Sequence, residues 1–389
     1  MRRISADERR ARLGLRHRLA APAASCVDVA RDLLGLHSSD AASVLLAARA
    51  RTNGLLAEDF ERELYETRSL ARVLGMRRTM FVVPVDLVPT IHAACTRDLA
   101  PRERRRLVRL LEEAGITDDG TRWLRRVEDA TLNALEARGQ ATAVQLSHDV
   151  PELRRQILFG KGKRWESTVG VSTRVLFLLA TEARIIRTRP RGSWTSTQYR
   201  WAPLRSWLGV DADALPTEAA RTVLARRWLE AFGPGTFDDL RWWTGWTVTQ
   251  TKRALTEAAP VEVALDGATG LVLPHDVAAV DAPGPWAALL PALDPTVMGW
   301  TGRDWYLGQH RAALLDRNGN AGPTVWWDGR VVGGWAQRSG GEIALGLLED
   351  VGSEAVSAIR TEAARLATWL GDVRFVPRFR TPLEQELTA

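Results

Sequence analysis

The stretch Arg184–Trp201, RIIRTRPRGSWTSTQYRW, alternates apolar and basic residues on both sides of Pro190-Arg191-Gly192. Alternation at period two predicts a strand on each side, and the Pro-Arg-Gly triplet predicts the turn between them. The preceding residues 169–183, VGVSTRVLFLLATEA, have the spacing of a helix whose leucines share one face, with Arg174 on the opposite face. The sequence therefore predicts a helix that leads directly into a basic hairpin.

Two more helices are predicted upstream of this hairpin. Residues 121–137 have apolar residues at helical spacing, and the triplet RGQ ends the pattern. Residues 142–150, TAVQLSHDV, form a short second helix. Three helices followed by a hairpin are the winged-helix variant of the helix-turn-helix.

The same organisation is predicted again from Thr217 onward. Three helices are expected within residues 218–258, with Thr236 and Thr247 as the N-caps of the second and third. The stretch 261–274, VEVALDGATGLVLP, then alternates at period two around Asp266-Gly267, which is a hairpin signal.

A less regular copy precedes both. Residues 25–40, 41–51 and 57–67 are predicted as helices, and residues 69–84, SLARVLGMRRTMFVVP, as two strands around Gly75–Arg78. The basic helical segment 95–115 connects this copy to the next.

The composition changes from about Pro283 onward. Residues 289–350 are strand-rich, with Asn318-Gly319 and Asp328-Gly329 as turn signals, and they are followed by one helix at 352–371 and a short strand, VRFVPRF, at 373–379. The expected fold is mainly α with β wings (α+β): three tandem winged-helix domains at 1–115, 116–212 and 213–280, and a β-rich α+β domain at 281–389.

The 389 residues carry a formal net charge of +6, and almost all of the basic residues are arginine. Arginine suits phosphate because its planar fork donates two hydrogen bonds, which favours a polyanionic partner; a coding bias towards arginine explains the composition equally well. Two cysteines build neither a disulfide framework nor a zinc site. No leader peptide or membrane span is visible, so we expect a cytoplasmic, nucleoid-associated protein.

Three basic winged-helix units favour DNA as the partner more than any single arginine does. Each unit can lay a helix in the major groove and a wing against the backbone. A single arginine is more often a solvated or ion-paired surface residue. The candidate contacts in the three units are Arg77, Arg78, Arg174, Arg187, Arg189, Arg191, Lys252 and Arg253.

No P-loop, dinucleotide fingerprint, zinc-deaminase motif or HExxH is present, and the histidines are scattered, so no metal site or cofactor is expected. The basic loop Phe159–Lys163, FGKGK, lacks the spacing of a phosphate-binding loop. The stretch LLGLHSSD, residues 33–40, has two interpretations. Ser39 would cap the next helix with Asp40 in its first turn, or His37 and Asp40 would share a helical face beside a cleft and orient a water.

The segments LLGLHSSDAASVLLAARAR, LGMRRTMFVVP, FGPGTFDDLRWWTG and LLPALDPTVMGW, in this order, resemble the AlkZ/YcaQ-type winged-helix DNA glycosylases. The resemblance spans nearly the whole chain. It implies a C-shaped molecule with DNA in a concave channel and hydrolysis of the N-glycosidic bond of a damaged base. It also implies a hairpin in the C-terminal domain that probes the DNA, with contacts from Arg317, Asn318 and Trp326.

Members of this family carry Gln-x-Gln or Gln-x-Asp where this chain has His37 and Ser39, with Asp40 next. The departure leaves Asp40 to stabilise an oxocarbenium-like sugar and hold a water, His37 to position that water or donate to the base, and Ser39 to hydrogen bond. No lysine is near the motif, so we expect a monofunctional, monomeric glycosylase acting on a lesion in double-stranded DNA, with a neutral, deaminated base as the candidate substrate. The alternative is a non-catalytic DNA-binding or regulatory protein that has lost the Gln pair.

Overall fold

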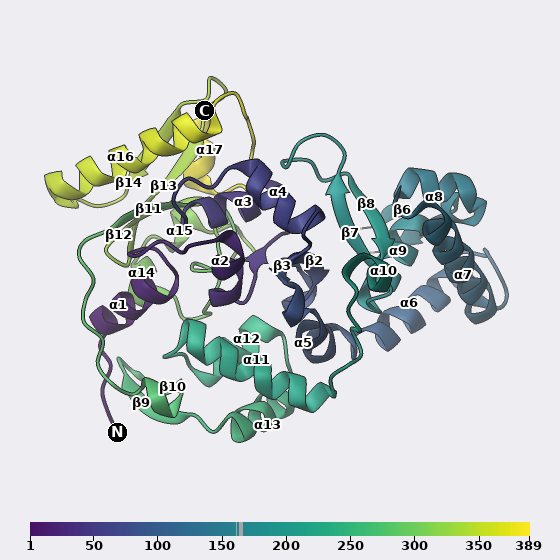
Figure 1. Cartoon of the computed structure of the whole chain (residues 1–389), viewed down its shortest axis with the longest axis horizontal. Coiled ribbons are helices and arrows are strands. Elements are labelled where there is room, and N and C mark those ends of the chain that lie inside the picture. Colours follow the sequence, from purple (N-terminus) through teal and green to yellow (C-terminus); the bar gives the residue numbers. More distant parts are fainter. Residues whose placement is uncertain (161, 163–165) are drawn as a thin grey trace.

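The computed structural model describes residues 1–160, 162 and 166–389, and the expected basic loop at 159–163 falls partly outside them. The fold is α+β, as predicted, with helices gathered around several small sheets (Figure 1). The expected strand at 373–379 was wrong. Pro377 provides no N–H for a ladder, and the segment crosses the molecule unpaired until the last helix, α17 (Pro382–Thr388), begins.

The first winged-helix unit has one strand that the sequence analysis did not predict. The expected helix over 25–40 ends at Asp32, and a two-residue strand follows it. The elements are α2 (Cys26–Asp32), β1 (Leu36–His37), α3 (Ala41–Arg49), α4 (Ala57–Tyr65), β2 (Leu70–Leu74) and β3 (Met80–Pro84). A tight turn at Met76–Arg78 joins β2 to β3, as the sequence predicts.

The second unit is α7 (Gly120–Arg138), β4 (Ala141–Thr142), α8 (Ala143–Asp149), α9 (Val171–Thr181) and the wing β7 (Ile185–Pro190) and β8 (Tyr199–Pro203). A small hairpin, β5 (Gln156–Phe159) and β6 (Ser167–Gly170), precedes α9. After β3 the chain forms α5 (Val88–Ile91) and a π-helical turn (His92–Thr96), and most of the basic connector forms α6 (Ala100–Glu113). Leu107 and Leu111 of α6 pack into the core of the second unit, so we infer that this unit begins at α6.

The third unit consists of α11 (Thr217–Phe232), α12 (Phe237–Thr244), α13 (Val248–Ala258) and the hairpin β9 (Val261–Leu265) and β10 (Ala268–Val272). Short helix α10 (Leu204–Leu208) links it to the second unit. Thr236 and Thr247 are the N-caps, and each forms a capping box with the residue three positions on, as the sequence predicts.

The C-terminal part contains one antiparallel sheet in the order β11-β12-β13-β14, covered by helices (Figure 1). The strands are β11 (Ala287–Leu290), β12 (Thr324–Trp327), β13 (Arg330–Gln337) and β14 (Ile343–Leu347). The helices are α14 (Asp304–Leu307), α15 (Arg311–Leu314), the long α16 (Gly352–Leu370) and α17.

One sheet joins the first two units. Its strand order is β1-β3-β2-β7-β8-β4, so the wings of both units lie edge to edge (Figure 1). The contact between them is a β2–β7 pairing in which Arg72 is opposite Arg187. Because both wings belong to one sheet, residues of β1, β2, β7 and β8 keep a fixed relative placement.

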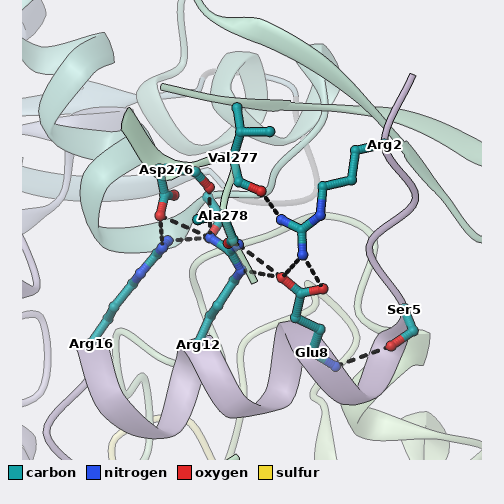
Figure 2. Close-up of polar contacts among 9 residues, drawn as sticks. Arg2, Ser5, Glu8, Arg12, Arg16, Asp276, Val277 and Ala278 are labelled. Carbon is teal, nitrogen blue, oxygen red and sulfur yellow. Dashed lines mark hydrogen bonds and ion pairs between the residues drawn. The ribbon is translucent and has the colours of Figure 1, made fainter. Parts of the chain in front are cut away.

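The N-terminal helix α1 (Ala6–Arg16) is fastened to the segment that follows the third wing (Figure 2). Arg12 is 1% exposed and donates to Glu8 and Asp276 at 2.8 Å and to the carbonyl of Ala278 at 2.6 Å. Arg16 donates to the same Asp276 carboxylate. This network ties the start of the chain to the third unit.

Candidate functional site

A cleft of about 730 Å³ lies between the first and second winged-helix units. The β1–α3 junction and the first wing line one wall, and α8, α9 and the second wing line the other. Arg378 of the C-terminal segment also reaches it. The cleft therefore brings together residues from three parts of the chain that are distant in sequence.

The charged side chains that line this cleft are all arginines: Arg78, Arg174, Arg187, Arg191 and Arg378. Within the part of the chain that the structure describes, its lining contains no aspartate, glutamate or histidine. Such a surface attracts an anion, and arginine forks match the geometry of phosphate oxygens. Four of the five arginines are among the predicted DNA contacts, and Arg378 is an addition.

Strand β1 positions the HSSD stretch at the cleft. Leu36 pairs with Val82 and His37 with Phe81, so the chain runs antiparallel to β3 and not along a helix. Gly35 makes this possible, because its φ is +111° and a Cβ there would lie 2.8 Å from the Val83 side chain. The expectation that His37 and Asp40 share a helical face was therefore wrong.

Asp40, and not Ser39, is the N-cap of α3. Its Oδ1 accepts from the backbone N–H groups of Ala42 at 3.0 Å and Ser43 at 3.1 Å. Its Oδ2 accepts from the backbone N–H of Arg378 at 2.6 Å. The side chain is buried behind the cleft wall, so both carboxylate oxygens hold the local structure together in this conformation.

His37 is also buried and does not line the cleft. Its ring centroid lies 5.0 Å from that of Phe81, and its Nδ1 accepts from the backbone N–H of Ser39 at 3.4 Å. Burial, with a smaller contribution from Arg77, lowers the pKa of His37 to about 3, so the imidazole is neutral at pH 7. Ser38 and Ser39 are the residues of the stretch that face the cleft.

Three residues beside the cleft were missed by the sequence analysis. Arg378 follows Pro377 in a segment that was predicted as a strand, and a proline within a strand pattern was the available signal. Arg72 is a single charge within the otherwise apolar strand LARVL, which is a signal for a buried cation. Tyr199 begins β8 and lines the cleft, and nothing in the local sequence distinguishes it.

The predicted contacts in the second wing have different environments. Arg191 is exposed at the tip, where its backbone N–H donates to the carbonyl of Gln198. Arg187 is partly buried, and its guanidinium carbon lies 5.4 Å from the ring centroid of Tyr199 and 5.2 Å from that of Trp201. Arg189 pairs with Glu61 and Glu66 of the first unit, so local carboxylates neutralise its charge.

The first wing has one arginine at the cleft and one away from it. Arg78 lines the cleft and pairs with Glu103 at 2.6 Å. Arg77 lies 3.9 Å over the ring of Trp242 of α12, and burial lowers its pKa to about 10. Arg77 therefore packs the first wing against the third unit, and its contact with DNA stays a prediction.

Trp326 is not a DNA contact in this structure. It is fully buried, and its ring stacks on that of Tyr306 with 5.4 Å between the ring centroids. Its indole N–H donates to Thr324 Oγ1 at 2.9 Å. Strand β12 is central, paired with both β11 and β13, and the burial of Trp326 shows that its side of the strand points into the core. The prediction for Trp326 was wrong because Trp326 is the inward-facing member of its tryptophan pair.

The remaining predicted contacts are exposed but lie away from the cleft. Lys252 and Arg253 are on the surface of α13, and Arg253 is 3.4 Å from Glu218. Arg317 and Asn318 are at the tip of a turn closed by the Leu315–Ala321 bridge. The contacts of these four residues with DNA stay predictions.

The described residues contain neither a metal centre nor a membrane-spanning helix. No group of three or more His, Cys, Asp or Glu side chains is placed to hold a metal ion there. None of the helices described is long and apolar enough to cross a membrane.

Residues 30–369 match the family described as DNA glycosylase AlkZ-like. Among solved structures, the fold is similar to the Streptomyces sahachiroi DNA glycosylase AlkZ, with a TM-score of 0.74 and 22% sequence identity over 96% of this chain and 98% of that chain. A search of the curated proteins gave no match. Because the family match spans most of the sequence, from α2 to the end of α16, the chain belongs to the AlkZ-like DNA glycosylase family.

Proposed function

We propose that this protein is a monofunctional DNA glycosylase that hydrolyses the N-glycosidic bond of a damaged, neutral base. The observation that carries the proposal is the position of Ser38 and Ser39 on the wall of a cleft whose charged residues are all arginines. Family membership supports DNA as the substrate. We further propose that it acts as a monomer on double-stranded DNA and is associated with the nucleoid.

Because His37 and Asp40 are buried behind the cleft wall, we assign them roles that differ from those expected from the sequence. The two carboxylate oxygens of Asp40 accept hydrogen bonds from three backbone N–H groups. Asp40 therefore acts through its negative charge, which stabilises the positive charge that develops on the oxocarbenium-like sugar. His37 accepts from the N–H of Ser39 and therefore acts as a positioning residue. The hydroxyl of Ser39 is left to hydrogen bond the attacking water.

The arginines favour a neutral base over a cationic alkylpurine. A neutral base gathers negative charge as its bond to the sugar breaks, and nearby guanidinium groups stabilise that charge. A cationic base would experience repulsion from the same groups. Deaminated bases such as uracil and hypoxanthine are therefore the first substrates to test.

The test is a panel of duplexes, each with one uracil, hypoxanthine, alkylpurine or interstrand crosslink, treated with excess protein and then alkali. We expect cleavage at a deaminated base, with Asp40→Asn and His37→Ala slowing the reaction while binding to undamaged DNA is retained. If every lesion stays intact at high protein concentration, the protein is the non-catalytic DNA-binding alternative. Cleavage of alkylpurines or crosslinks alone would contradict the proposed base class.

A further inference from the structure

Arg72 is a buried cation without a carboxylate partner in the described part of the chain. The residue is 5% exposed, and its hydrogen-bond partners are the hydroxyls of Ser38 and Tyr65. The ring of Tyr199 lies 4.7 Å from its guanidinium carbon. Buried charges in proteins are normally paired with an opposite charge, so a buried arginine with no carboxylate beside it needs an explanation.

Ser38 converts this buried charge into a directed hydrogen-bond donor. Its Oγ accepts from Arg72 Nη1, and its backbone N–H donates to the carbonyl of Met80 at 2.7 Å. Because the Oγ already accepts from a cation, its own O–H is polarised and has to donate elsewhere. Ser38 lines the cleft, so this O–H can donate to a ligand bound there.

Two more guanidinium groups flank the same position. Arg187 is opposite Arg72 in the β2–β7 pairing, and it shares the ring of Tyr199 with Arg72, at 5.4 Å and 4.7 Å respectively. Arg378 lines the same cleft, and its Nη1 donates to the carbonyl of Ser39 at 3.3 Å. Three cations around one polarised hydroxyl form an arrangement suited to a tetrahedral oxyanion.

We propose that Ser38 binds a phosphodiester group of the DNA backbone, with Arg72 as the residue that positions and polarises its hydroxyl. Arg187 and Arg378 supply the remaining positive charge around that phosphate. The inference rests on the proposal that DNA occupies the cleft, but it does not require that the bound DNA is cleaved. It assigns a role to Ser38, which lies between the two positions carried over from the family motif.

The experiment measures equilibrium binding of the full-length protein to an undamaged duplex by fluorescence anisotropy. We expect Ser38→Ala to weaken binding by about tenfold or more, as for loss of one charge-assisted hydrogen bond, and Ser38→Thr to restore part of it. Ser69→Ala is the matched control, because Ser69 bonds to Glu63 and Thr67 outside the cleft. Arg72→Met should weaken binding in the same way, provided that its circular dichroism spectrum is native.

A second arm locates the phosphate. In a series of duplexes, a neutral methylphosphonate replaces one phosphate at a time. We expect the replacement at one position to weaken binding by the wild type but not to weaken binding by Ser38→Ala any further. Affinity of Ser38→Ala within twofold of the wild type would overturn the inference, even if base excision were slowed. If Ser38→Ala weakens DNA binding as expected but the wild type cleaves none of the lesions, only the proposed glycosylase activity is contradicted.

Discussion

The backbone N–H of Arg378 donates to Oδ2 of Asp40 at 2.6 Å, joining two residues that are 338 positions apart. The same carboxylate caps α3 through Oδ1. A single side chain thus fixes the start of a helix and holds the C-terminal segment against the cleft wall. Asp40 therefore has a structural role in addition to any chemical one.

Asp40→Ala and Asp40→Asn should separate these two roles. Alanine removes the cap and all three hydrogen bonds that the carboxylate accepts, so the free energy of unfolding should fall by about 1–2 kcal/mol or more. Asparagine retains one capping oxygen but no charge, so it should be more stable than the alanine variant while losing activity. Urea denaturation and single-turnover cleavage measure the two effects. Equal activity of Asp40→Asn and the wild type would contradict a catalytic role for the charge.

Acid should destabilise the protein through two buried histidines. Burial lowers the pKa of both His17 and His37 from 6.5 to about 3. Below pH 6.5 the unfolded chain binds protons that the folded state does not, so stability falls as the pH drops from 6.5 towards 3. Each histidine contributes about 1.4 kcal/mol per pH unit in this window.

His37→Gln should therefore reduce the loss of stability between pH 6.5 and pH 5, measured by urea denaturation at each pH. His148→Gln is the control, because the side chain of His148 is 81% exposed. An identical pH dependence of the wild type and His37→Gln would show that the imidazole is not buried in its neutral form.

The Arg51–Asp294 ion pair should stabilise the packing of the C-terminal part against the first unit. Both side chains are 0% exposed, and Arg51 Nη2 lies 2.6 Å from Asp294 Oδ1. Removing one partner leaves the other charge buried, so Arg51→Met or Asp294→Asn should each cost about 3–5 kcal/mol of unfolding free energy. The double substitution should cost less than the sum of the two. Additive losses in a double-mutant cycle would contradict direct coupling.

Arg191 should be a phosphate contact, since it is exposed at the tip of the second wing and lines the cleft. Arg191→Gln should weaken binding to all DNA sequences alike and lower the slope of log affinity against log salt by about 1. Arg360→Gln on the exposed face of α16 provides a control with the same change in charge. Equal salt slopes for the two variants would exclude Arg191 from the interface.

The helices and hairpins could be predicted because local signals specify them. Thr236 and Thr247 start helices through capping boxes, and Asp266-Gly267 closes a hairpin. Strand β1 could not be predicted in this way, because its two residues are a strand only through pairing with Val82 and Phe81. The local sequence favoured a helix through residue 40, but the pairing of β1 with β3 ends that helix earlier.

The composition of the site was harder to predict than its location. The HSSD stretch was assigned to the site, but the sequence did not show which of its side chains face the cleft. His37 pairs with Phe81 at the end of β1, and Ser38 and Ser39 follow it and line the cleft. Arg72 and Arg378 come from a strand interior and from the C-terminal segment, so only the fold brings them together.

The most direct measurement is the release of free base from a uracil- or hypoxanthine-containing duplex, detected by mass spectrometry before any alkali is added. The proposed monofunctional mechanism predicts free base and an intact strand with an abasic site, and much slower release by Asp40→Asn. No base released at high protein concentration, or strand cleavage without alkali, would contradict it.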